Sequence, residues 1–213
     1  SLLERALVRQ IGESRPVDAP TFFFIDIQPD QKDAFQRLIR DRVGLRPEMT
    51  PLVRARLHRV NGQAVALNED ERSDREQDRD KGDRNPSWYA TREYVLTFLD
   101  HLQKDNVFDK GTWWEAGQQF PEPLISVEEE AAKHLGLDLG SSVELEIQGV
   151  TLTAKVSSIR KVEWGNFSTN FYMIISPGAL EGAPFTYVAT ARVPPSDETP
   201  LQRAVVQAFP NVT

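Results

Sequence analysis

The sequence predicts an α+β fold, a split sandwich formed by the two chain ends around an inserted, mostly-β lobe. Two observations support this prediction. A strand, a proline break and an amphipathic helix follow one another near each end of the chain. The middle contains a helix with start and stop signals, followed by a hairpin with period-two alternation. We therefore expect residues 19–66 and 184–213 to form the sandwich and residues 67–183 to form the inserted lobe.

The first third of the chain is predicted to form a strand, a helix, a second strand and a hairpin. An amphipathic stretch over residues 1–16 precedes them. Thr21 to Ile27 is the first strand, and Asp30 is the expected N-cap of the helix. The helix is expected to end at Gly44. Four apolar residues share its predicted buried face: Phe35, Leu38, Ile39 and Val43.

The predicted hairpin ends this first third. Leu52 to Val60 alternates as a strand, turns at Asn61-Gly62 and returns through Ala64 to Leu67. Asn-Gly between apolar runs is among the strongest short-range hairpin signals, because both residues tolerate positive φ. In residues 68–84, acids and bases alternate without an apolar residue, which indicates a solvated loop.

The inserted lobe has its clearest signals in a helix and the hairpin after it. Ser126 and Glu129 have the spacing of a capping box, and Gly136 is a helix stop. Val127, Ala131 and Leu135 would share one face of the helix. The chain then alternates with period two on both sides of the turn at Gln148-Gly149. The alternating apolar residues are Val143, Leu145, Ile147, Val150, Leu152, Ala154 and Val156.

The C-terminal end repeats the strand–helix pattern of the N-terminal end. Phe185 to Val193 is the predicted strand. Thr199 is expected to cap the helix that follows, with Pro200 at its first position, where a proline costs no hydrogen bond. Pro210 is expected to end the element. The apolar residues predicted to face inward are Leu201, Ala204, Val205 and Ala208.

Composition narrows the class of protein. The 213 residues carry a net charge of -7 and a pI near 5.1, which argues against nucleic-acid binding and against a general electrostatic attraction to anionic lipid. Cysteine is absent, so disulfides and thiolate chemistry are excluded. No apolar run reaches the roughly 20 residues needed to span a bilayer.

The sequence assigns no catalytic, cofactor-binding or metal-binding residue. His58, His101 and His134 lack the spacing of a metal site, so we interpret each as a surface or partly buried imidazole. Serine acyl-transfer motifs and glycine-rich phosphate loops do not occur in the sequence. An ATPase within this chain is thereby excluded.

One alternative hypothesis is a small carbohydrate-active hydrolase that uses Glu115 with one carboxylate of Glu128–Glu130. Trp113 and Trp114 precede Glu115, and aromatic rings beside paired carboxyls are typical of glycoside hydrolysis. The structural interpretation is favoured, because three acids in the first turn of a helix simply complement its dipole. The hydrolase requires two carboxyls about 5 to 10 Å apart in a cleft.

Aromatic residues supply the candidate contact residues. Trp164 and Phe167 belong to a predicted loop, and the buried strand Asn170 to Ile175 follows it. Exposed rings there would contact a partner or a lipid-like ligand, whereas rings that cap the core would be structural. Trp113 and Trp114 are candidates for the same role.

Three segments together carry a resemblance to a known family. GTWW at 111–114, LISVEEEAAKHLGLDLGSSVELEIQG at 124–149 and VSSIRKVEWGNFSTNFYMIISPGAL at 156–180 resemble the extracytoplasmic core domain of FtsX-like, MacB-type ABC transporter permeases. The flanks APTFFFIDIQPDQ at 19–31, VRARLHRVNGQAV at 53–65 and FPNVT at 209–213 are similar to the YbbP-like branch, whose large permeases carry two such domains. The likeness covers nearly the whole chain and departs most over 68–110.

The resemblance implies a fold, a location and partners. The chain ends would form a porter-like α/β sandwich, and the insertion a mostly-β, Sabre-like lobe. The domain would be periplasmic, between spans of a bacterial inner-membrane permease that lie just before Ser1 and just after Thr213. Residues 1–18 would then be a juxtamembrane stalk, and both chain ends would lie close together on one face.

The implied role is mechanical and requires no catalysis by this chain. A separate cytoplasmic ATPase subunit would drive motions that the domain transmits. These motions would move a hydrophobic or lipid-type substrate, such as a lipoprotein, or activate a periplasmic partner protein. A soluble periplasmic binding module without a membrane link is the remaining alternative.

Overall fold

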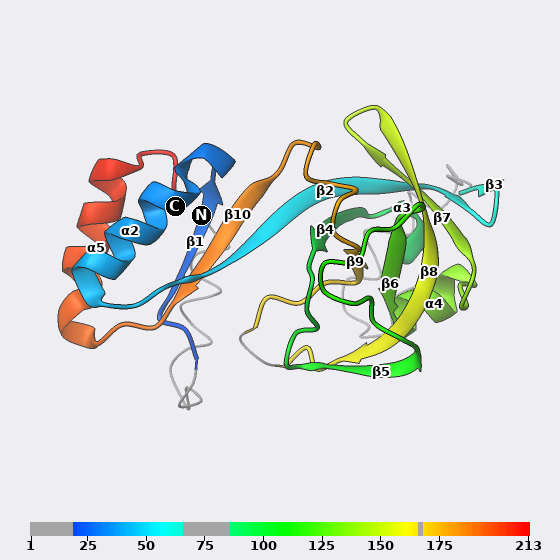
Figure 1. The fold of residues 1–213 in the computed structure, drawn as a ribbon, viewed down its shortest axis with the longest axis horizontal. Helices are drawn as coiled ribbons and strands as arrows, with labels where there is room; N and C mark the ends of the chain where they lie inside the picture. Colours follow the sequence, from blue (N-terminus) through cyan, green and yellow to red (C-terminus); the bar gives the residue numbers. More distant parts are fainter. Residues whose placement is uncertain (1–18, 66–85, 166–167) are drawn as a thin grey trace, which may run out of the picture. The chain divides into compact units, whose positions relative to one another are not determined.

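The computed structural model describes residues 19–65, 86–165 and 168–213. They fall into two compact units, which we describe separately: unit 1 comprises the described part of Ser1–Thr50 together with Thr186–Thr213, and unit 2 comprises that of Pro51–Phe185. The fold is α+β, as the sequence predicts (Figure 1). No helix in the described ranges combines the length and the apolar character that a membrane span requires.

Unit 1 contains two strands, two long helices and a 3-10 turn, together with the first residues of β2. Strand β1 pairs antiparallel with β10, and α2 and α5 contribute further core residues, together with Val193, Phe209 and Val212 outside these elements (Figure 1). The elements are β1 (Phe22–Ile27), η1 (Pro29–Gln31), α2 (Lys32–Val43), β10 (Thr186–Ala191) and α5 (Pro195–Ala208).

Aromatic packing joins the two chain segments of unit 1. The Phe35 ring lies 5.4 Å from the ring of Phe24 and 5.7 Å from that of Phe209, measured between centroids. Phe35 and Ile39 are fully buried on α2, as predicted, whereas Leu38 and Val43 are partly buried. The predicted stop at Gly44 is confirmed by its positive φ of 70°.

Both predicted helix starts in unit 1 are wrong. Asp30 is not an N-cap, because Gln28 and Gln31 form a reciprocal capping box around η1 and α2 follows directly. In α5, Pro195 occupies the first position, four residues before the predicted cap Thr199, and Pro200 lies inside the helix. Proline is favoured at the first position of a helix, and both Pro195 and Pro200 could occupy it. The helix begins at the earlier of the two, Pro195.

Unit 2 is built around strands that close on themselves. β2 pairs with β4, β4 with β9, β9 with β6, β6 with β8, β8 with β7, and β7 with β2 again. We call these strands the strand ring. The pairs β4–β9 and β6–β8 are parallel and the others are antiparallel. β5 pairs with the second half of β8, and β3 with the end of β2.

The elements of unit 2 follow one another closely along the chain. They are β2 (Glu48–Val60, which begins in unit 1), β3 (Gln63–Ala64), α3 (Pro86–Thr91), β4 (Glu93–Phe98), β5 (Asn106–Gly111), β6 (Leu124–Glu128), α4 (Glu129–Leu135), β7 (Ser142–Ile147), β8 (Val150–Val162) and β9 (Met173–Ile175).

Both predicted hairpin turns are present. Asn61 and Gly62 have φ of 49° and 77°, and Gln148 and Gly149 have φ of 48° and 82°. Two successive positive φ values define the turn type that matches strand twist. Asn61 also accepts a hydrogen bond from the Ser142 amide at 3.0 Å, which ties one hairpin to β7.

The predicted capping box at Ser126 is wrong. Ser126 lies in β6, fully buried, and α4 starts only at Glu129. Glu128 is the N-cap, and its carboxylate accepts from the Ala131 amide at 2.9 Å. The predicted helix stop at Gly136 is confirmed, with φ of 66°.

The division into units and the strand lengths differ in part from the predictions. The sequence places residues 51–66 in the sandwich, whereas residues 51–65 belong to unit 2, because β2 continues into the strand ring. The strand predicted from Asn170 is confined to β9, and the Asn170 side chain instead accepts a hydrogen bond from the Asn106 amide at 3.0 Å. The predictions for residues 1–18 and 68–84 lie outside the described residues.

Candidate functional site: two aromatic clusters of unit 2

The first cluster comprises one residue of β5 and three aromatic residues that follow this strand. We define the tryptophan cluster as Phe108, Trp113, Trp114 and Phe120. The rings of Trp113 and Trp114 lie 4.0 Å apart between centroids, with Phe108 6.2 Å from Trp113 and Phe120 6.3 Å from Trp114. Trp114 is buried, whereas Phe108 is 37% exposed. Trp114 therefore anchors the cluster, and Phe108 presents part of it to solvent.

Backbone contacts fix the two tryptophans. The Trp113 indole donates to the Asp100 carbonyl at 3.1 Å, and the Trp114 indole donates to the Leu99 carbonyl at 2.8 Å. Gly111 allows the approach to β8, because a Cβ there would lie 2.2 Å from the Ser157 carbonyl oxygen. The pair is thus held to two neighbouring segments.

The second cluster surrounds an arginine. We define the Arg92 cluster as Trp88, Arg92, Tyr94, Trp164 and Tyr172. The Arg92 guanidinium lies 4.1 Å from the ring centroid of Trp88, 5.0 Å from that of Tyr94 and 4.8 Å from that of Tyr172. Such cation–π contacts stabilise by about 0.5 to 2 kcal/mol each.

Trp164 covers one side of this cluster and remains accessible. Its ring lies 4.6 Å from that of Tyr172, yet the residue is 45% exposed. The packing on Tyr172 fits the interpretation of Trp164 as a cap of the core, and its exposure fits the interpretation as a contact residue. Phe167, its predicted companion, lies outside the described residues.

The two clusters lie on different sides of one segment. Phe171 packs in a core cluster with Trp114, whereas its neighbour Tyr172 packs with Trp164. Phe171 thus belongs to one core cluster of unit 2, whereas Tyr172 packs against another. In the described part of unit 2, no ring contact joins Trp164 to Trp113 or Trp114, so the predicted contact residues belong to two separate clusters.

A buried polar network joins three segments of unit 2. Arg160 is fully buried. It donates to the Ser126 hydroxyl at 3.1 Å, to the Asn106 side-chain oxygen at 2.6 Å and to the Phe171 carbonyl at 2.6 Å. Ser158 donates to Ser126 at 2.7 Å. Arg160 thereby holds β5, β6 and the segment before β9 together.

Burial governs the titration of this network. Desolvation lowers the pKa of Arg160 to about 9, and the negative charge of Glu128 opposes that shift. Burial also raises the pKa of Glu128, against the hydrogen bonds that its carboxylate accepts. Arg160 nevertheless remains charged at neutral pH, because its pKa stays above 7.

Sequence reasoning missed this network, although one signal was present. The inward-facing positions of β8 include Ala154 and Val156, and the same alternation places Ser158 and Arg160 inward. A polar pair on the inward face of a strand indicates a buried hydrogen-bond network. The partners Asn106 and Ser126 could not be identified from spacing alone.

The carboxylates of the hydrolase alternative have other partners. Glu128 caps α4, Glu129 lies 3.9 Å from Lys161, and Glu130 lies 3.6 Å from His134. Glu115 is exposed, and within the described residues no hydrogen bond or ion pair joins it to these three. The contacts thus give no support to a catalytic pair.

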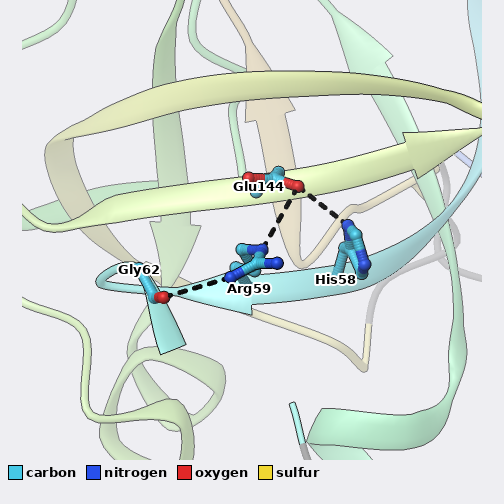
Figure 2. A network of polar contacts seen from close by, with 4 residues as sticks. All are labelled: His58, Arg59, Gly62 and Glu144. Carbon is cyan, nitrogen blue, oxygen red and sulfur yellow. Dashed lines mark hydrogen bonds and ion pairs between the residues drawn. The ribbon is translucent and has the colours of Figure 1, made fainter. Parts of the chain in front are cut away.

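The three histidines each lie beside a carboxylate. Figure 2 shows His58 and Arg59 of β2 pointing toward Glu144 of β7: His58 Nδ1 lies 2.8 Å from a Glu144 oxygen, and Arg59 Nε 3.7 Å from the same oxygen. Arg59 also donates to the Gly62 carbonyl.

His101 contacts Asp100 at 2.7 Å, and this bond lowers the pKa of Asp100. No metal-binding group of three ligands occurs in the described ranges.

These features describe an α+β domain of two units with two aromatic surfaces. Over 191 residues the chain is 31% identical to an uncharacterised ABC transporter permease, YbbP, of Escherichia coli (strain K12). The match covers 90% of this chain and 21% of that protein, so the chain spans about a fifth of its relative. The resemblance to an ABC transporter permease that the sequence suggested is confirmed.

The similarity to solved structures is weaker. A solved domain of a proposed permease protein from Porphyromonas gingivalis is similar at a TM-score of 0.38 and 14% identity, covering 81% of this chain and 73% of that one. No protein-family model matches the chain.

Proposed function

We propose that this chain is a periplasmic domain of an ABC transporter permease that transmits ATP-driven motion and contacts a hydrophobic substrate or a partner protein. The single observation that carries the proposal is the 31% identity to YbbP over 90% of the chain. In this proposal a separate cytoplasmic ATPase hydrolyses ATP. The described residues need then supply only shape and contact surfaces.

The location is tested by labelling with a membrane-impermeant maleimide. This chain contains no cysteine, so it adds no background label. Val150, 69% exposed at the hairpin tip, is replaced by cysteine in the full-length protein after cysteines elsewhere have been removed. Ala154→Cys, fully buried on the same strand, is the matched control.

The expected result is labelling of Val150→Cys in intact cells with a permeabilised outer membrane, and of Ala154→Cys only after denaturation. Labelling of Val150→Cys that requires disruption of the inner membrane would place the domain in the cytoplasm and overturn the proposal.

The Arg92 cluster is the surface that we propose for contact with an apolar substrate. The ring of Trp164 is exposed and packs against the ring of Tyr172. Because this packing already restricts the exposed ring, the ring loses less conformational entropy when a ligand binds. The tryptophan cluster, through Trp113 and Phe108, is the corresponding candidate for a partner protein.

An apolar dye tests the substrate contact. Purified chain should enhance the fluorescence of N-phenyl-1-naphthylamine, and Trp164→Ser should reduce this enhancement severalfold. Val150→Ser removes an even more exposed apolar side chain and should leave the enhancement unchanged. Equal signals from both variants would exclude Trp164 as the contact.

A further inference from the structure

The outer face of α2 forms a groove of about 350 Å³ in unit 1. Asp33, Gln36, Arg37 and Arg40 have the spacing of one helix face, and they lie opposite the buried pair Phe35 and Ile39. Gly44, with φ of 70°, reverses the chain after the helix. This reversal lets Arg46 line the same groove.

The groove contains more positive charge than its surroundings neutralise. Three arginines line it against one carboxylate, that of Asp33, in the part of the chain that the structure describes. Arg40 lies 3.5 Å from Asp41. Within the same described residues, Arg37 and Arg46 make neither a hydrogen bond nor an ion pair.

We propose that this groove binds a phosphate-bearing anion, either the headgroup of an anionic lipid or a small soluble phosphate. All three cations are arginine, whose planar fork matches phosphate oxygens better than a lysine does. The Gln36 amide adds a neutral donor at the same site. The chain as a whole is acidic, so the groove is a local exception to its net charge of -7.

A structural role explains only part of this arrangement. Cations in the last turn of a helix complement its dipole, which applies to Arg40 and Arg42. Arg37 lies a turn earlier and Arg46 lies beyond the helix, yet both line the groove. The inference is independent of the proposed function, since a phosphate site would suit a domain in any compartment.

The test uses the purified chain and two probes. Flotation with vesicles of phosphatidylglycerol and phosphatidylcholine, against phosphatidylcholine alone, measures headgroup binding. Titration with inorganic phosphate, followed by thermal shift, measures soluble phosphate. The triple variant Arg37→Gln, Arg40→Gln, Arg46→Gln should lose binding, by about 100-fold for vesicles at roughly fivefold per arginine.

Two control variants separate the groove from general charge. Arg42→Gln, Arg192→Gln, Arg203→Gln removes the same charge from exposed sites of unit 1 outside the groove and should bind as the unaltered chain does. Asp33→Asn removes the carboxylate of the groove and should tighten binding severalfold. Circular dichroism verifies that each variant is folded.

Each outcome decides the proposal. Groove-dependent binding of vesicles alone identifies a lipid headgroup, and groove-dependent binding of phosphate alone identifies a soluble anion. Binding of neither probe, or equal losses in the two triple variants, overturns the phosphate site.

Discussion

At the scale of single residues, Arg160 donates more buried side-chain hydrogen bonds than any other residue in the described part of unit 2. It satisfies a hydroxyl, an amide oxygen and a backbone carbonyl that lie in three different segments. An arginine that donates to neutral acceptors needs no carboxylate in contact, but removing it leaves the buried Asn106 and Phe171 oxygens without their donor, while Ser126 keeps the hydrogen bond from Ser158.

Replacement of Arg160 by Met should therefore be strongly destabilising. We expect a loss of roughly 3 kcal/mol in the free energy of unfolding, measured by urea titration, because the buried Asn106 and Phe171 oxygens lose their donor and Ser126 keeps only the bond from Ser158. Lys161→Met, at the next and exposed position, should change stability by less than about 1 kcal/mol. Similar losses for the two variants would contradict the role of the network.

Glu128 should make stability depend on pH. Burial raises its pKa above the usual 4.5, so the folded chain holds this proton to a higher pH than the unfolded chain does. The stabilisation from that proton is complete below about pH 4.5 and is lost as the pH rises through the folded pKa. A glutamine side chain in place of Glu128 would stay neutral and could still accept from the Ala131 amide.

Urea titrations of the Glu128→Gln variant across pH 4 to 8 test this linkage. The variant should gain stability relative to the unaltered chain as the pH rises through this window. Glu122→Gln, at an exposed position, should show a constant difference. A constant difference for Glu128→Gln as well would mean that burial does not shift its titration.

At the scale of elements, two glycines with similar φ have different reasons to be glycine. Gly111 and Gly149 have φ of 77° and 82°. A Cβ at Gly111 would collide with the Ser157 carbonyl at 2.2 Å, whereas nothing lies within 4 Å of a Cβ at Gly149. The first glycine maintains the β5–β8 pairing, and the second only forms a turn.

We expect Gly149→Ala to cost about 1 kcal/mol, the strain of a left-handed alanine. Gly111→Ala should cost at least about 2 kcal/mol more, because β5 must also move away from β8. Equilibrium unfolding of both variants measures the difference. Loss of the hydrogen-exchange protection of Asn106 to Gly111 in the second variant alone would locate the damage at β5.

The elements also show where sequence reasoning succeeds and fails. Turns such as Gln148-Gly149 and stops such as Gly136 are local, since their φ angles follow from residue type, and they were predicted. Ser126 was wrongly predicted as a cap because its hydroxyl serves a partner 34 residues away, Arg160. Likewise, nothing local indicates that Trp164 and Trp113 lie on different sides of the segment that contains Phe171 and Tyr172.

At the scale of the whole molecule, the two units have separate cores. The apolar cluster around Phe35 contains only residues of unit 1, and the cluster around Leu145 contains only residues of unit 2. Chains with separate cores often unfold in more than one step. β2 nevertheless runs from one unit into the other without a break.

We expect Phe35→Ala to destabilise unit 1 by about 3 to 5 kcal/mol and to leave β9 protected. Hydrogen exchange should speed up in β1 and β10 and stay slow at Met173 to Ile175, which are fully buried between β4 and β6. Leu145→Ala should give the opposite pattern. Equal acceleration in both units would show that they unfold together.

The closed strand ring brings the two ends of unit 2 close together. Val53 near its entry pairs with Leu96, and Phe185 at its exit lies against Phe98, with 5.3 Å between ring centroids. Both ends of unit 2 thus meet near the end of β4. A short glycine linker could join them, and the chain could be opened instead at Gln148-Gly149. Such a circular permutant would lack unit 1 but would keep the pairings of the strand ring, which makes the order of these strands in sequence separable from their order in space.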